Sequence, residues 1–309
     1  MNGNTRGATR HGWRAVVAAA FAAALLLLAA APAHPQQADA AALRAKHAAL
    51  RESLQRNEFK RPIVLESRQT SGDLEGDVYA LVDHPFERVD ATLKSVAQWC
   101  DILMLHLNVK HCRASAPEVA PATLVINVGK KYDQPLEDTY RVQFSYRVAA
   151  ATPDYLQIQL RAGEGPLGTR DYRITLQAVA LDARHSFVHL TYAYTYGMAA
   201  RLAMQGYLST LGRGKVGFSV VGRDAAGKPV YVDNVRGVVE RNTMRYYLAI
   251  DAALDTQGLP AAERQEKRLR DWFAATERYP LQLHEMAQDE YLDMKRKEFR
   301  RQQADHKPT

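Results

Sequence analysis

The sequence contains little cysteine and lacks the short motifs of several common enzyme classes. Its 309 residues include two cysteines and no C-x-x-C pair, which is a poor ligand set for structural zinc. Motifs of the G-x-S-x-G, H-E-x-x-H and Walker types are also absent, so nothing indicates a hydrolase nucleophile, a metalloprotease or a phosphate-binding loop. We therefore predict no metal and no cofactor, and we do not favour an enzyme.

Long apolar runs are missing everywhere except near the N-terminus. There, Ala15–Ala31 follows a basic segment and precedes Ala31-Pro32-Ala33. This order is typical of a secretory signal peptide with an A-x-A cleavage site, and Ala38-Asp39-Ala40 is a second candidate for cleavage. We predict a signal peptide over residues 1–33 and a periplasmic location. An uncleaved membrane anchor is the alternative.

A large excess of either charge is absent as well. The net charge is +7, and loss of Arg6, Arg10 and Arg14 with the signal peptide would leave about +4. Because this excess is small, we predict no nucleic-acid partner. It is compatible with contact to anionic lipid headgroups, and the basic run Lys295–Arg301 is the segment that could make such a contact.

The two cysteines, Cys100 and Cys112, are close in sequence. In an exported protein, such a pair favours a disulfide. The alternatives are two free thiols or a metal site with His106 and His111.

The spacing of apolar residues predicts strands and helices along the chain. The pattern predicts strands at Ile63–Glu66, Asp77–Val82, Thr123–Gly129, Tyr140–Val148, Tyr155–Ala162, Tyr172–Leu181 and Ser186–Tyr196, and Val109–Arg113 is expected to lead back toward the sheet. Helical spacing predicts helices at Ala40–Phe59, Phe86–Met104, Met198–Leu211 and Val235–Leu254. Between the last two helices, Val216–Val221 and Pro229–Val232 are expected to form a hairpin. Short connections between the strands favour antiparallel pairing.

The helix Val235–Leu254 has a long apolar stripe, with charged residues such as Glu240, Arg241 and Arg245 on its other side. An amphipathic helix after a run of antiparallel strands predicts an α+β fold, in which a curved sheet grips the helix. The stripe also contains Asn242 and Tyr246. We therefore expect a hollow, not a solid core, between helix and sheet.

The segment Ala261–Gln303 differs from the rest because it is dense in charged residues. Pro280 divides it into two predicted helices. Its sparse apolar anchors are Leu269, Trp272, Phe273 and Leu283. We expect it to wrap the domain or to contact a partner.

This order of elements resembles the helix-grip fold of the START-like superfamily, which includes polyketide cyclases and plant pollen-allergen proteins. The segments that carry the resemblance are Asp77–Val82, Phe86–Met104, Thr123–Tyr196 and Val235–Leu254. The predicted divisions are a signal peptide (1–33), a helical N-terminal extension (34–61), a START-like domain (62–257) and a charged helical tail (258–309). The resemblance implies an internal hydrophobic cavity that holds a lipid, sterol, polyketide or similar molecule.

Tyrosines recur on the predicted inner faces of this fold. A tyrosine offers an apolar ring with one polar tip, which suits a cavity for an amphipathic ligand. The predicted ligand-binding residues are Tyr146, Tyr192, Tyr194, Asn242 and Tyr246. A simple aromatic core is the alternative.

We therefore predict a protein that binds, and carries through the periplasm, a hydrophobic small molecule or lipid. One alternative is a cyclase or dehydratase that uses His189 or a pocket tyrosine for acid–base catalysis. Another is an assembly protein with a filled core, whose charged tail meets a partner.

Overall fold

The computed structural model describes residues 35–116, 121–209 and 213–305. The chain forms two compact units, Met1–Asp39 and Ala40–Thr309. Apart from the first residues of α2 (Pro35–Gln55), every element described belongs to the second unit. The predicted signal peptide over residues 1–33 lies outside the described residues.

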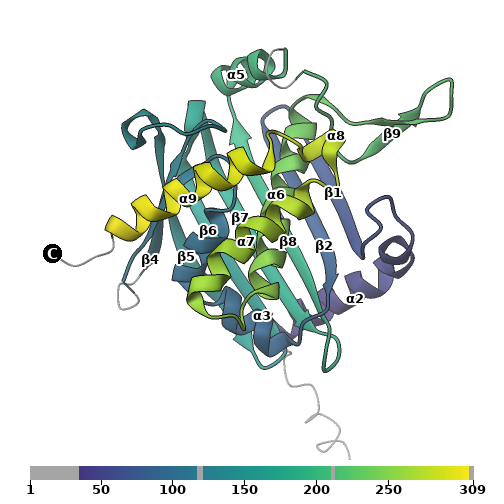
Figure 1. Ribbon diagram of the computed structural model, residues 1–309. Helices are drawn as coiled ribbons and strands as arrows, with labels where there is room; N and C mark the ends of the chain where they lie inside the picture. Colours follow the sequence, from purple (N-terminus) through teal and green to yellow (C-terminus); the bar gives the residue numbers. More distant parts are fainter. Residues whose placement is uncertain (1–34, 117–120, 210–212, 306–309) are drawn as a thin grey trace, which may run out of the picture. The chain divides into compact units, whose positions relative to one another are not determined.

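An antiparallel sheet of eight strands organises this unit (Figure 1). The strands are β1 (Ile63–Gln69), β2 (Asp73–Val82), β3 (Val109–Ala114), β4 (Ala122–Val128), β5 (Tyr140–Thr152), β6 (Tyr155–Glu164), β7 (Thr169–Ala180) and β8 (Ser186–Tyr196). Their spatial order is β1-β2-β8-β7-β6-β5-β4-β3, so β1 and β3 form the two edges. Residues alternate between the faces: in β8, Leu190 and Tyr192 join the main core, whereas Phe187 packs on the opposite face.

Helices cover one face of the sheet (Figure 1). They are α3 (Phe86–Leu93), α4 (Val96–Leu103), α6 (Asn234–Asp255), α7 (Ala261–Thr276), α8 (Pro280–Leu283) and α9 (Gln288–Asp305). The long helix α6 lies against β1, β2 and β8, α7 packs on α6, and α9 packs on α7 and β3. The predicted α+β fold, with a sheet that grips a long late helix, is confirmed. Among the described helices, none combines the length and the apolar character needed to span a bilayer.

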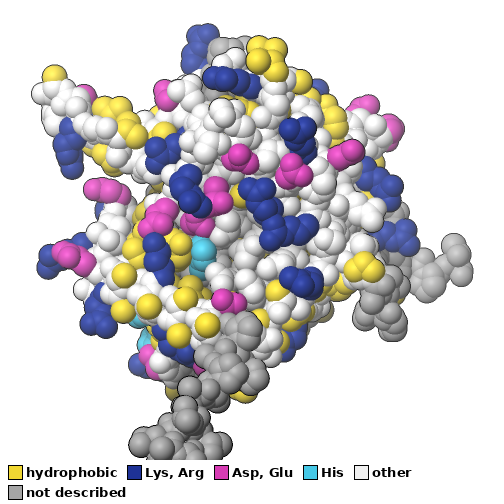
Figure 2. Space-filling model, turned by 180° about the vertical axis from the view of Figure 1, so that it is seen from behind, with side chains coloured by type: hydrophobic (Ala, Val, Ile, Leu, Met, Phe, Trp, Pro, Cys, Tyr) yellow, Lys and Arg dark blue, Asp and Glu magenta, His cyan; other side chains and the backbone are white. Residues whose placement is uncertain are grey.

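The other face of the sheet is covered in part by α2. Leu43 and Leu54 of this helix pack with Tyr79, Phe187 and other outward-facing residues in a second, smaller core. Figure 2 views the molecule from this side and shows acidic and basic side chains interspersed over the exposed surface.

The predicted helix Phe86–Met104 is wrong in one respect, because it is broken into α3 and α4. Ser95 has extended backbone angles, and its hydroxyl accepts from the N–H of Gln98, which makes it the N-cap of α4. The indole N–H of Trp99 donates to the carbonyl of Leu93 at 2.7 Å. The phenol of Tyr146 donates to the carbonyl of Lys94 at 2.8 Å. Tertiary hydrogen bonds thus satisfy the carbonyls that the break leaves open.

The charged side of α6, predicted to lie opposite the apolar stripe, does not face solvent. Glu240 is fully buried, and Arg241 and Arg245 are each 2 % exposed. The reason is that α7 and α8 pack on the helix, so α6 lies between the sheet and the C-terminal segment. The expected anchors of that segment, such as Leu269 and Trp272, are indeed buried.

The predicted strand Val216–Val221 is also shorter than expected. The hairpin consists of β9 (Val220–Arg223) and β10 (Pro229–Tyr231). Before it, the buried carboxylate of Glu240 accepts from the backbone N–H of Phe218 at 2.5 Å and of Ser219 at 2.9 Å. These N–H groups therefore bond to α6 instead of to a neighbouring strand.

Candidate ligand-binding site

A cavity of about 50 Å³ lies between α6 and the sheet. Its lining is apolar and aromatic: Leu103, Ile126, Val128, Val142, Phe144, Pro166, Tyr172, Ile174, Tyr192 and Tyr246. Most of these residues come from strands β4, β5, β7 and β8, and Tyr246 comes from the gripping helix. The cavity is thus formed where the sequence predicted a hollow.

The cavity is much smaller than that prediction implied. Pockets for small molecules usually measure about 300–1,000 Å³, and an engineered cavity that takes up benzene measures about 150 Å³. Three tyrosine rings, those of Tyr172, Tyr192 and Tyr246, belong to the lining of this small cavity. Entry of a ligand therefore requires some of these side chains to move.

Four tyrosines form a connected aromatic cluster at the cavity. The ring centroids of Tyr192 and Tyr246 are 5.2 Å apart, and those of Tyr172 and Tyr194 are also 5.2 Å apart. Tyr192 and Tyr194 are 5.6 Å apart. Burial raises the pKa of all four phenols, so each stays neutral at physiological pH.

The hydroxyls of these tyrosines differ in their partners. The hydroxyl of Tyr172 lies 2.7 Å from that of Thr169, and the hydroxyl of Tyr194 has only the sulfur of Met204 at 3.9 Å. Within the described residues, the hydroxyls of Tyr192 and Tyr246 make no hydrogen bond. Both residues line the cavity, so their hydroxyls can receive a polar atom of a ligand or a water molecule.

The other predicted ligand-binding residues lie outside this lining. Tyr146 is buried at the break between α3 and α4, where it bonds to Lys94. Asn242 is half-buried on α6, one turn before Tyr246. Tyr194 touches the cavity residues only through its ring contacts.

His106 is a neighbour of the site that the sequence did not single out for ligand binding. Its ring stacks on Tyr246 at 4.8 Å and is 3 % exposed. Burial, with the nearby charges of Arg245 and Lys295, holds the pKa of His106 well below its usual value, so the imidazole is neutral. The nearby side chain of Asn242 acts on this pKa in the opposite direction. No local pattern predicts this contact, because His106 lies in the turn after α4.

A basic cluster adjoins the aromatic residues; we use this term for Lys131, Lys215, Arg241 and Arg245. Glu285 is the carboxylate among them. It lies 2.6 Å from Arg245 Nη2 and 2.6 Å from Lys131 Nζ. Burial and the charge of Arg245 lower the pKa of Lys131 to about 8. Arg245 and Lys131 are also among the charges that act on His106, whose ring stacks on Tyr246, so the cluster lies near the cavity lining.

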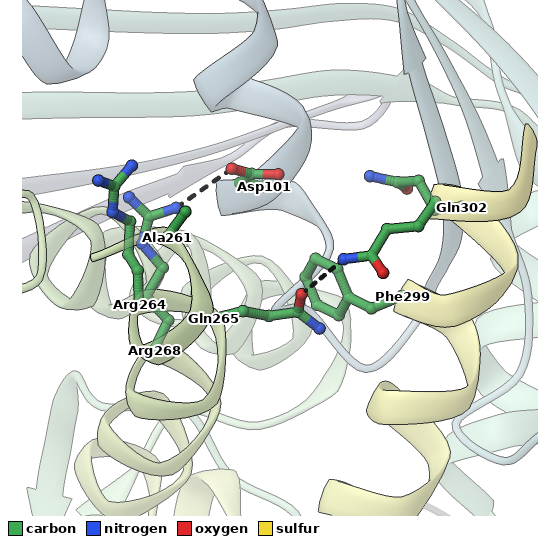
Figure 3. Close-up of a pocket in the computed structure, with 8 residues that line it drawn as sticks. Asp101, Ala261, Arg264, Gln265, Arg268, Phe299 and Gln302 are labelled. Carbon is green, nitrogen blue, oxygen red and sulfur yellow. Dashed lines mark hydrogen bonds and ion pairs between the residues drawn. The ribbon is translucent and has the colours of Figure 1, made fainter. Parts of the chain in front are cut away.

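A larger hollow of about 200 Å³ lies between α4, α7 and α9 (Figure 3). Its polar side chains bond to one another. Arg268 donates to Asp101 at 3.3 Å, and Gln303 donates to Gln265 at 3.1 Å. Because these groups already have partners, the hollow is a less convincing ligand site than the smaller cavity.

His189, considered as a general base, lies on the face of the sheet opposite α6. Its ring nitrogens contact Asp77 at 2.8 Å and Gln177 at 3.0 Å, and its ring stacks on Tyr79 at 4.1 Å. It cannot act on a molecule held beneath α6.

The predicted disulfide between Cys100 and Cys112 is confirmed. It joins α4 to β3, and the two Cα atoms are 5.3 Å apart. The cysteines are therefore not available as thiolate ligands beside His106 and His111.

The glycine spacing G-x-G-x-x-G occurs twice, beginning at Gly163 and Gly212. The first spans the connection from β6 to β7, which are antiparallel neighbours. A dinucleotide-binding turn joins a strand to a helix in a parallel βαβ unit, so this spacing has no such role. Gly212 lies outside the described residues.

No protein-family model matches the chain, and no curated protein matches it. Similar solved structures include the human StAR-related lipid transfer protein 5, at 10% identity, which covers 72% of this chain and 100% of its own, with a TM-score of 0.36. The Zhui aromatase/cyclase from Streptomyces sp. R1128 is 14% identical, and the match covers 59% of this chain and 91% of the cyclase, with a TM-score of 0.36. Norcoclaurine synthase from Thalictrum flavum is 11% identical, and the match covers 47% of this chain and 85% of the synthase, with a TM-score of 0.32.

At these values, the similarities do not bear on what this chain binds. The order of the eight strands and the place of α6 against them are observed directly. On that topology, the chain has a helix-grip fold, in which an antiparallel sheet packs around a long helix.

Proposed function

We propose that this protein binds a small hydrophobic or amphipathic molecule between α6 and the sheet. The observation that carries the proposal is the pair of phenol hydroxyls, Tyr192 and Tyr246, which line an apolar cavity and have no hydrogen-bond partner in the described residues. A ligand with one polar atom would satisfy them and bury its apolar part against the surrounding side chains. Each buried methylene would contribute about 0.8 kcal/mol.

The cavity would enlarge on the side of helix α5 (Met198–Ser209). This helix packs on the short turn Pro166–Gly168, and Pro166 lines the cavity. Among the described side chains of α5, Ala200 is buried and Met204 is partly buried, whereas Met198 and Leu202 are exposed. Segments with few buried apolar contacts open at low cost in free energy.

Carriage of this molecule through the periplasm is the finer form of the proposal. Support comes from the disulfide, since disulfides persist mainly in oxidising compartments, and from the signal-peptide pattern of the first 33 residues. Peripheral contact with an anionic membrane through Lys295–Arg301 has weaker support. Lys295 is fully buried, Arg296 bonds to Glu266 at 2.7 Å, and Lys297 pairs with Asp133.

The test is a fluorescence titration with N-phenyl-1-naphthylamine, a neutral probe that brightens in apolar surroundings. We expect saturable binding that is lost in Ile126→Phe, because the larger ring fills the cavity. Val125→Phe is the matched control, since Val125 is the preceding residue of β4 and points to the other face of the sheet. If both variants bind the probe equally well, the probe does not occupy this cavity, and the proposal is rejected.

Native mass spectrometry of protein purified from its producing cells provides the second measurement. A co-purifying adduct that organic extraction identifies as a lipid or other hydrophobic molecule would support the proposal. Repeated absence of an adduct would favour the alternative of an assembly protein. Two observations favour that alternative: the small volume of the cavity, and the hairpin β9–β10, whose Val220, Val221 and Val230 are exposed.

A further inference from the structure

We infer that the molecule bound between α6 and the sheet carries an anionic group, such as a carboxylate, sulfonate or phosphate, which binds the basic cluster in place of Glu285. The inference rests on the proposed function and deepens it, because it names the chemical class of the ligand. The bound molecule is thus an anionic amphiphile.

Two cations of the cluster meet at one carboxylate. Lys131 and Arg245 share the single carboxylate of Glu285. Lys215 reaches the backbone carbonyl of His284, the residue before Glu285, and Arg241 donates to the carbonyl of Val216 at 3.1 Å. Glu285 thus pairs with two members of the cluster, Lys131 and Arg245, while the nearby Glu277 pairs with His284 at 2.9 Å.

Two cations of the cluster are almost completely buried. Arg241 and Arg245 are each 2 % exposed, and Nε of Arg245 has no hydrogen-bond partner within the described residues. Like charges held together away from water destabilise one another, and an unpaired buried donor is also unfavourable. Both costs fall when an anion arrives. The lowered pKa of Lys131 has the same origin, since burial and Arg245 disfavour its charged form.

The cluster adjoins the cavity at two points. On α6, Arg245 is followed by Tyr246, which lines the cavity. On the sheet, Val128 at the end of β4 lines the cavity, and the chain continues from it to Lys131. A molecule with its apolar part beside Tyr192 and Tyr246 would therefore direct one end toward these charges.

Glu285 occupies the position that such an anionic group would take. It lies in the connection between α8 and α9, not within a helix. Its carboxylate already makes the contacts that carboxylates, sulfonates and phosphates make with lysine and arginine. The side chain thus substitutes for the ligand in the empty protein and competes with it.

Two probes with the same aromatic skeleton test the inference. N-phenyl-1-naphthylamine is neutral, and 8-anilinonaphthalene-1-sulfonate adds one sulfonate. We expect Lys131→Gln to weaken binding of the sulfonate by about tenfold or more, in line with the strength of charge-assisted hydrogen bonds, and to leave the neutral probe within about twofold. Lys130→Gln removes the same charge from the preceding, exposed residue and should change neither affinity. Lys215→Gln is a second variant should Lys131→Gln fail to fold.

Glu285→Gln tests the competition directly. Removal of the carboxylate should tighten binding of the sulfonate several-fold and leave the neutral probe unchanged. If the charged probe responds no more than the neutral one to Lys131→Gln, or binds more weakly to Glu285→Gln, the anionic group is rejected and the proposed function stands. If the neutral probe does not bind to the unmodified protein at all, the proposed function itself fails.

Discussion

The side-chain oxygen of Gln302 accepts a hydrogen bond from the backbone N–H of Cys112, and the two atoms are 3.0 Å apart. Cys112 belongs to β3, which is an edge strand, and Gln302 belongs to α9. From the same helix, Lys295 donates to the carbonyl of Val109 at 2.9 Å, and Arg301 donates to the carbonyl of Lys110 at 3.0 Å. Side chains of α9 thus take the place of a neighbouring strand, and they protect an edge that could otherwise pair with another chain.

Gln302→Ala should lower the free energy of unfolding by about 1–2 kcal/mol, because the N–H of Cys112 loses its partner in a buried place. Gln303→Ala is the control, since this neighbouring amide is exposed and bonds only to Gln265 across the surface. Urea unfolding of both variants measures the difference. Equal losses would show that the edge contact is not specific.

Glu298→Gln should destabilise the protein much more. Its carboxylate lies 3.0 Å from Lys110 Nζ and 2.8 Å from Lys295 Nζ, and all three side chains are fully buried. Without the negative charge, two buried ammonium groups lose their counterion, at a cost of about 3–5 kcal/mol. Glu290→Gln, an exposed position on the same helix, should change the unfolding free energy by less than about 0.5 kcal/mol. A mild effect at Glu298 would mean that water reaches this network.

Stability should increase as the pH rises above about 8. Burial lowers the pKa of Lys131 and of Lys295 to about 8, below the value of 10.5 expected in the unfolded chain. Between these values the unfolded chain binds more protons than the folded one, so deprotonation favours folding. Differential scanning calorimetry between pH 7 and 10 measures the change in Tm. A steady fall in Tm over this range would contradict the prediction.

The buried tyrosines should reverse this trend above about pH 10. Burial raises the pKa of Tyr192 and Tyr291 well above 10.0, so these phenols stay protonated in the folded protein while they ionise in the unfolded chain. Stability is then lost as the pH rises through about 10. The two effects together predict a maximum of Tm between about pH 9 and 10.

Two conservative tyrosine variants should differ in their effect on the free energy of unfolding. Tyr146→Phe should lower the free energy of unfolding by about 1 kcal/mol, because the carbonyl of Lys94 loses its donor. Tyr246→Phe removes a hydroxyl that has no partner in the described residues, so stability should be unchanged or higher. Thermal unfolding in parallel tests both. A clear loss of stability in Tyr246→Phe would reveal a partner for this hydroxyl and weaken the case for a ligand there.

Reduction of the disulfide should lower stability by about 3 kcal/mol, since Cys100 and Cys112 are 12 residues apart. The double variant Cys100→Ala/Cys112→Ala should behave like the reduced protein. Its neutral-probe affinity should also fall, because α4 carries Leu103 of the cavity lining. Unfolding with and without dithiothreitol tests the first point, and a gain of two hydrogens in the intact mass confirms the reduction.

The sequence alone determined most of the segments that become strands and helices, because these depend on local periodicity. Alternation in Tyr140–Val148 and helical spacing in Val235–Leu254 each place apolar side chains on one face, and no distant contact is needed to recognise that pattern. The pairing of Cys100 with Cys112 also followed from the sequence, since two cysteines permit a single bridge.

The tertiary structure alone decided which of these surfaces are buried and how much space they leave. Local spacing does not show that α7 and α8 cover the charged side of α6, or that the carboxylate of Glu240 accepts from a distant loop. Tyr146 and Tyr192 have the same local signal, but only Tyr192 reaches the cavity. The size of a cavity depends on how rings from separate elements interlock, so it cannot be read from spacing along the chain.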